Sequence, residues 1–104
     1  MNYADPPDHP WLRAPATELV AALHEREIRA TDLLETVLRR ADEISEPVNP
    51  FAVRMDDAAH RAAEESDRRL ATGAARPLEG LPVSVKDSQW LAGVPTSSGS
   101  RARA

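Results

Sequence analysis

Apolar residues recur at helical spacing in the first half of the chain. Between residues 17 and 26, three of them fall on one face of a helix that Thr17 can cap: Leu19, Val20 and Leu23. A second stretch starts at Thr31 and repeats the spacing over five positions: Leu34, Val37, Leu38, Ala41 and Ile44. We expect Pro47 and Pro50 to stop it, because proline lacks the amide hydrogen that a helix interior needs. The pattern therefore predicts a pair of helices.

Residues 56–72 predict a third helix, with Gly73 as its C-terminal stop. Its inward face consists almost wholly of small side chains: Ala59, Ala62, Ala63 and Ser66, with Leu70 at the end. Small side chains allow a helix to approach its neighbour closely. Asp56 and Asp57 complement the positive end of the helix dipole. We expect the charged run at 67–69 to lie on the solvated face.

Two short runs predict strands rather than helices. Residues 51–55 are short and mostly apolar, residues 81–86 form an apolar run that ends in a lysine, and 90–94 suits a further strand or a turn. The order of elements indicates the α/β class, but two or three isolated strands do not make an independently stable sheet. We therefore expect residues 17–104 to be the beginning of a larger α/β domain, incomplete on its own. Residues 1–16, which hold four prolines, are expected to form an irregular arm.

Composition narrows the classes of function. The 104 residues are 41% hydrophobic and 29% charged, as in a soluble globular domain. A net charge of −4 argues against nonspecific electrostatic binding to nucleic acid or to an anionic membrane. The first sixteen residues lack the apolar core and basic head of a secretory signal, and no stretch approaches the ~20 apolar residues of a membrane span. The chain has no cysteine, so it forms no disulfides and has no thiolate nucleophile. Because disulfides are typical of oxidising compartments, we expect a cytoplasmic protein.

Lys86 is the only lysine among 13 basic residues, and it ends the predicted 81–86 strand. A lysine can lose its proton when it is buried, whereas an arginine effectively cannot, so the position suits a base. A strand end beside a tight turn is a common site for such a residue in α/β enzymes. Asp87 opposes this role if its carboxylate lies close, because it favours the charged lysine. For Lys86 to act as a base, the Asp87 carboxylate has to point elsewhere, for example toward backbone amides of the following turn. The alternative is a solvated charge at the end of a strand.

Other candidates for chemistry are weaker. The serine- and glycine-containing run at 96–100 suits a nucleophile loop, an anion-binding nest or simply a polar loop. His9, His24 and His60 are spread along the chain without the spacing of metal ligands, so we expect surface histidines. The sequence thus predicts neither a metal site nor a cofactor.

The region around Lys86 resembles the amidase signature family. That family's lysine segment has the form P-L-x-G-[IL]-P-x-x-V-K-D, followed by a short apolar piece and G-x-x-T-x-x-G-S. The matching positions here are Pro77, Leu78, Gly80, Leu81, Pro82, Val85, Lys86, Asp87, Gly93, Thr96, Gly99 and Ser100. The helix pair, the run 48–53 and the alanine-rich helix are also similar to family segments. The resemblance covers most of residues 17–101.

The resemblance implies the N-terminal part of an α/β/α amidase domain that hydrolyses a small-molecule amide. Catalysis in that family uses a Ser–cis-Ser–Lys triad without a cofactor, and Lys86 matches its lysine. The neutral lysine takes a proton from the bridging serine, which activates the nucleophilic serine. The full-length protein is then expected to be a homodimer or part of a multisubunit complex.

The sequence departs from the family in one respect. Both triad serines belong to a glycine- and serine-rich segment downstream, which we expect this chain to lack. Ser97 and Ser98 fall instead in the T-x-x-G-S region, so they are not assigned to the triad, and we expect the chain to be inactive alone. Two alternatives stay open. One is a fragment of an amidotransferase A-type subunit, which would release ammonia for a partner enzyme. The other is a non-catalytic helical remnant that binds a partner.

Overall fold

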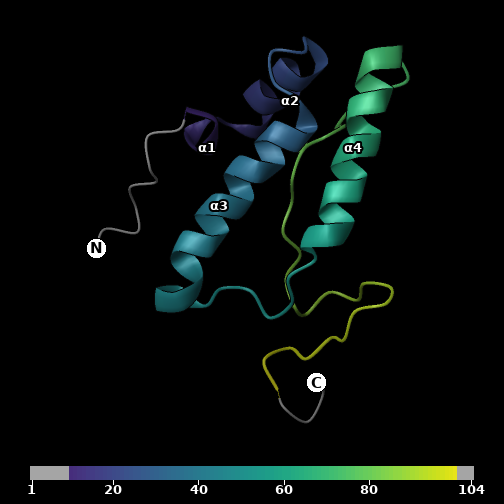
Figure 1. Cartoon of the computed structure of the whole chain (residues 1–104). Coiled ribbons are helices and arrows are strands. Elements are labelled where there is room, and N and C mark those ends of the chain that lie inside the picture. The colour runs from purple at the N-terminus through teal and green to yellow at the C-terminus, as the bar shows by residue number, and fades with distance from the viewer. Residues whose placement is uncertain (1–9, 101–104) are drawn as a thin grey trace.

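A computed structural model of the chain describes residues 10–100, and its regular elements there are four helices. They are α1 (Pro10–Arg13), α2 (Ala16–His24), α3 (Ala30–Val48) and α4 (Asp56–Thr72). Helices α3 and α4 pack against each other and run in opposite directions, and the chain after α4 returns between them (Figure 1). The small face of α4 lets this return segment approach both helices.

The three long helices lie where the apolar pattern predicts them, with differences at their ends. Helix α4 has the predicted bounds, and Gly73 ends it at a φ of 77° in the left-handed region, where glycine has no steric penalty. Helix α2 starts one residue before Thr17, and Pro15 is its N-cap. Pro47 does not stop α3 as predicted, because it lies in the last turn, where it removes only one helical hydrogen bond. Asn49, at a φ of 48°, ends that helix.

The start of α3 is capped from another helix. Its N-cap residue, Arg29, makes no side-chain cap. The carboxylate of Asp67 on α4 instead accepts hydrogen bonds from the Ala30 amide at 2.6 Å, the Thr31 amide at 3.4 Å and the Thr31 hydroxyl at 2.7 Å. The prediction that residues 67–69 lie on a solvated face is therefore wrong for Asp67. Its charge satisfies free amides at the positive end of α3 and ties the two helices together.

The core is small and lies where α2, the start of α3 and α4 meet. Its buried members are all aliphatic: Ala22, Leu23, Ile28, Ala30, Leu33, Leu34 and Ala63. Leu23 and Leu33 are the largest side chains that are almost completely buried among the described residues. The fold therefore depends on hydrogen bonds and ion pairs between its elements as well as on apolar burial.

The expected strands are not formed in the described residues. Residues 51–55 make an irregular connection between α3 and α4. Arg54 fixes this connection, because it pairs with Asp42 of α3 at 3.0 Å and with Asp56 of α4 at 2.7 Å. Residues 81–86 carry no helix or turn and have no neighbouring strand, and an isolated Leu91–Val94 bridge is the β pairing found within 10–100. A β-strand requires a hydrogen-bonded partner, so the α/β class is not confirmed here.

The N-terminal end also differs from expectation. The segment 1–16 was predicted to be irregular, yet residues 10–13 form one helical turn. Trp11 of this turn packs against the core, which agrees with an arm that docks onto the body of the molecule. The remainder of the predicted arm, residues 1–9, lies outside the described residues. None of the helices within 10–100 is long and apolar enough to cross a membrane.

We predict that Asp67→Ala destabilises the chain by about 1 kcal/mol, the usual effect of losing a helix cap. Glu64→Ala is the matched control, because Glu64 is an exposed acidic residue of the same helix. Urea unfolding followed by the helical circular dichroism signal at about 222 nm would compare the two variants. Equal midpoints would show that the Asp67 contacts do not stabilise α3.

Candidate functional site

The return segment 76–83 is held against the helices at a tight turn. Gly80 has a φ of 84°, and a Cβ atom added there would lie 3.0 Å from the Ala30 Cβ and 3.4 Å from Leu23. Both the backbone conformation and the close approach therefore require glycine. The imidazole Nε2 of His24 lies 3.2 Å from the Pro77 carbonyl oxygen, which joins the same turn to α2.

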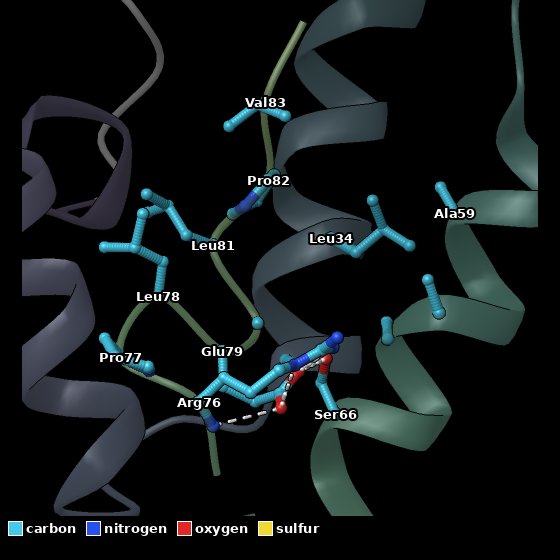
Figure 2. A pocket seen from close by; sticks show the side chains of 14 residues that line it. Leu34, Ala59, Ser66, Arg76, Pro77, Leu78, Glu79, Leu81, Pro82 and Val83 are labelled. Atoms are coloured by element: carbon cyan, nitrogen blue, oxygen red, sulfur yellow. Dashed lines mark hydrogen bonds and ion pairs between the residues drawn. The ribbon is translucent and has the colours of Figure 1, made fainter. Parts of the chain in front are cut away.

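Glu79 is a buried carboxylate next to this turn, and its side chain is 1% exposed. It accepts hydrogen bonds from the Ser66 hydroxyl at 2.7 Å and from Nε and Nη2 of Arg76 at 3.0 and 2.9 Å. Figure 2 shows Ser66 of α4 meeting Arg76 and Glu79 of the return segment at one end of a pocket. The carboxylate thus joins the return segment to α4.

The charges around Glu79 account for its burial. Hydrogen bonds from the Arg76 guanidinium, followed by that of Ser66, outweigh desolvation and lower the pKa of Glu79 to about 2. Arg69 lies nearby, with its Nε 3.9 Å from Glu79 and 3.5 Å from Glu65, but this buried nitrogen donates no hydrogen bond within residues 10–100. Glu79 is therefore ionised at neutral pH, and its charge is compensated mainly by Arg76.

A groove of about 670 Å³ runs from this cluster between α3, α4 and the return segment. Leu34 of α3 and the alanine face of α4 line it on one side, and Leu81, Pro82 and Val83 line it on the other (Figure 2). Beyond the groove the return segment leaves the helices. Val83, Val85 and Trp90 are exposed, and Trp90 retains 93% of its accessible surface.

Lys86 lies at the end of the 81–86 segment and is exposed in this structure. Its carbonyl oxygen accepts a hydrogen bond from the Gln89 amide at 2.9 Å, which closes a tight turn. The structure thus has the predicted turn after Lys86, but it brings no serine hydroxyl of residues 10–100 into hydrogen-bond contact with the lysine.

The Asp87 carboxylate binds a later loop, in agreement with the sequence-based expectation that it points to backbone amides rather than to Lys86. It accepts from the Ser97 amide at 3.3 Å and from the Ser97 hydroxyl. The hydroxyl and then the backbone amides of residues 97–99 lower the pKa of Asp87. The loop 96–100 is therefore an anion-binding turn, and the anion that it binds is this carboxylate.

The histidines form no site in the described part of the chain. His24 is exposed and bonds a backbone oxygen, His60 lies in α4, and His9 is outside the described residues. No group of three metal-binding side chains is found within residues 10–100.

Comparison with known families identifies the chain. The family model described as Amidase matches residues 32–104, which include α3, α4, the groove and Lys86. The chain belongs to the amidase family. The resemblance inferred from the lysine segment is thereby confirmed.

Curated relatives of two kinds match this amidase-family chain. The A subunit of glutamyl-tRNA(Gln) amidotransferase from Methylococcus capsulatus is 37% identical over 89 residues, which are 86% of this chain and 18% of the relative. The protein of the same name from Aromatoleum aromaticum is 38% identical over 90 residues, with the same coverage. "Putative amidase AmiA2" of Mycobacterium tuberculosis is 35% identical over 85 residues, or 82% of this chain and 18% of the relative.

The chain spans about a fifth of the length of these relatives. No solved structure matches it.

Sequence reasoning missed the residues that hold the lysine-bearing segment in place. Glu79 occupies the unspecified position of the amidase motif, and Ser66 was interpreted only as a small residue. One signal was present in the sequence. Glu79 is the single charged residue between Pro77 and Val85, and Arg76 lies three positions before it.

We predict that Glu79 makes the stability of the chain depend on pH. Because its pKa is lowered in the folded state, its contribution is present above about pH 4.5 and is lost as the pH falls toward about 2. Glu79→Gln should lower the free energy of unfolding at pH 7 by roughly 1–3 kcal/mol and flatten the acid dependence.

Urea unfolding at a series of pH values tests this prediction. Glu64→Gln on the exposed side of α4 is the control, and it should keep the wild-type profile. An unchanged acid slope in Glu79→Gln would contradict the prediction.

Proposed function

We propose that this chain supplies the lysine-bearing part of an amide-hydrolysing enzyme, with Lys86 as the general base. The observation that supports this most directly is the position of the lysine. The single lysine ends an extended segment whose other end is fixed to the helices at Gly80 and Glu79, inside the region that matches the amidase family. A general base requires such fixed placement.

In the complete enzyme, residues 81–86 would become a strand of an α/β/α domain. The exposed Val83 and Val85, together with a backbone at 82–85 that has no partner strand among the described residues, favour pairing with a neighbouring strand. Pairing would bury Lys86, and burial favours the neutral amine that a base requires.

The proposed reaction is acyl transfer to a serine. Neutral Lys86 accepts a proton from a bridging cis-serine, which accepts the proton of the nucleophilic serine as that oxygen attacks the amide carbon. The amine or ammonia leaves from the tetrahedral intermediate and an acyl-enzyme remains, which water then hydrolyses. Neither serine is assigned to a residue of this chain.

A second candidate is the same chemistry within an amidotransferase A-type subunit. The names of the relatives from Methylococcus capsulatus and Aromatoleum aromaticum favour it. In that case the released ammonia would pass to a partner protein instead of into solution. Grafting the matched residues into each kind of relative would show which one retains its activity.

We predict that Lys86→Arg is nearly as damaging as Lys86→Ala. Arginine keeps the positive charge but cannot accept the relayed proton, and loss of a positioned base typically lowers the rate about 10²- to 10⁴-fold. The measurement is kcat for ammonia release from a panel of simple amides. The enzyme is the Mycobacterium tuberculosis relative carrying the matched residues of this chain.

The ungrafted relative is the positive control for that assay. If Lys86→Arg retains most of the activity of the graft, Lys86 serves as a fixed positive charge and the general-base assignment is wrong. A graft that is folded but inactive, beside an active ungrafted relative, would count against the proposed function as a whole.

We also predict that the 104-residue chain alone releases no ammonia from simple amides. The covalent path needs a nucleophile, and neither triad serine is assigned to a residue of this chain. Sustained ammonia release by the purified chain, abolished by Lys86→Met, would overturn this prediction.

A further inference from the structure

Two oppositely charged residues stand side by side at the end of the return segment. A carboxylate next to a lysine favours the protonated lysine, which is the wrong state for the general base proposed above. The ion pairs within residues 10–100 involve arginine side chains, and none joins Lys86 to Asp87. The question is which contacts of the Asp87 carboxylate take the place of a pair with Lys86.

These contacts come from the loop 96–100. The carboxylate of Asp87 accepts from the amide and the hydroxyl of Ser97, and the Asp87 carbonyl oxygen accepts from the Ser98 amide at 3.4 Å. The Gly99 amide donates to the Ser97 oxygen at 3.4 Å, which leaves the hydroxyl hydrogen directed at Asp87. Both the side chain and the backbone of Asp87 are thus held by residues ten or more positions later.

A tight turn gives the loop a fixed backbone conformation beside Asp87. Ser98 and Gly99 follow one another with φ values of 50° and 76°, so both lie in the left-handed region. A non-glycine residue is uncommon there, and the Ser100 amide donates to the Ser97 carbonyl oxygen at 2.8 Å, which closes a tight turn around these two residues. The groups that act on Asp87 come from residues 97–99, and none of them is charged. The carboxylate therefore stays ionised, but it is turned toward neutral donors.

We infer that Ser97 sequesters the Asp87 carboxylate, so that Asp87 orders the loop without stabilising the protonated form of Lys86. Asp87 and Ser97 are positioning residues in this arrangement, since neither needs to touch a substrate. The inference rests on the proposed function for its purpose, because only a lysine that acts as a base needs a neutral amine. The contact itself can be tested without any activity.

The single lysine makes that test direct. The whole 104-residue chain, grown with lysine labelled with ¹³C and ¹⁵N, gives a single set of lysine side-chain signals, because Lys86 is the only lysine. The measurement is the pH at which the Lys86 side-chain signals change, followed by NMR at low ionic strength. Amide spectra of the same samples report whether α3 and α4 stay folded.

We expect Ser97→Ala to loosen the hold on the Asp87 carboxylate, which keeps only backbone amide donors, and to raise that midpoint by about 0.3 pH unit, as expected for a carboxylate that moves closer in a solvated site. The double variant Asp87→Asn/Ser97→Ala should show no rise, because the negative charge is gone. Ser97→Thr retains the hydroxyl and should keep the wild-type midpoint.

Each result decides for or against the inference. An unchanged midpoint in Ser97→Ala overturns it, and so does a rise that persists in the double variant. If the NMR results agree with the inference while Lys86→Arg is active in the grafted enzyme, the sequestration stands and the general-base role falls. If Ser97→Ala alters the folded spectrum, Ser97→Thr is compared with the double variant Asp87→Asn/Ser97→Thr instead. The Lys86 midpoints of these two variants agree if the hydroxyl sequesters the charge of Asp87. A clearly lower midpoint in the double variant overturns the inference.

Discussion

The burial of the Glu79 carboxylate is the constraint on which the rest of this structure depends. An ionised group can leave water only where hydrogen bonds and opposite charge replace its hydration. Arg76 lies close enough along the chain to meet this requirement only if residues 76–79 turn, and Ser66 can contribute only if the turn lies against α4. Satisfying one carboxylate therefore fixes both the shape of the turn and its position in the fold.

Helix α4 connects the two halves of this arrangement. Two consecutive residues of this helix contact different elements: Ser66 binds the return segment, and Asp67 caps α3. The alanines that precede them leave room for the groove and contribute little apolar surface. In a chain with so few large buried side chains, these directional contacts specify the arrangement that a larger core would otherwise impose.

The three longer helices were predictable from sequence, and the strands were not, for a physical reason. Helical hydrogen bonds are local, so the spacing of Leu34, Val37 and Leu38 and the glycine after Thr72 are sufficient to locate α3 and α4. A strand depends on a partner elsewhere in the chain, and residues 81–86 have none among the described residues. Glu79 and Asp67 were missed because apolar periodicity assigns charged residues to solvent. The position of Lys86 in an ordered motif was visible in the sequence, whereas the tie between Asp87 and Ser97 depends on a loop conformation that no local pattern specifies.

The fixed turn at Gly80 has a mechanical consequence for Lys86. If residues 81–86 pair as a strand in the complete enzyme, these six extended residues would reach about 20 Å, and a shift at the point where Gly80 meets Ala30 would be carried along them. A tilt of about 5° at that point would move the far end by nearly 2 Å, and misplacement by about 1 Å already impairs catalysis strongly. The sizes of the side chains at positions 30 and 80 therefore affect the position of the Lys86 side chain, which neither of them touches. A larger residue at position 30 would move the Lys86 side chain, even though position 30 lies in α3, far from the lysine in sequence.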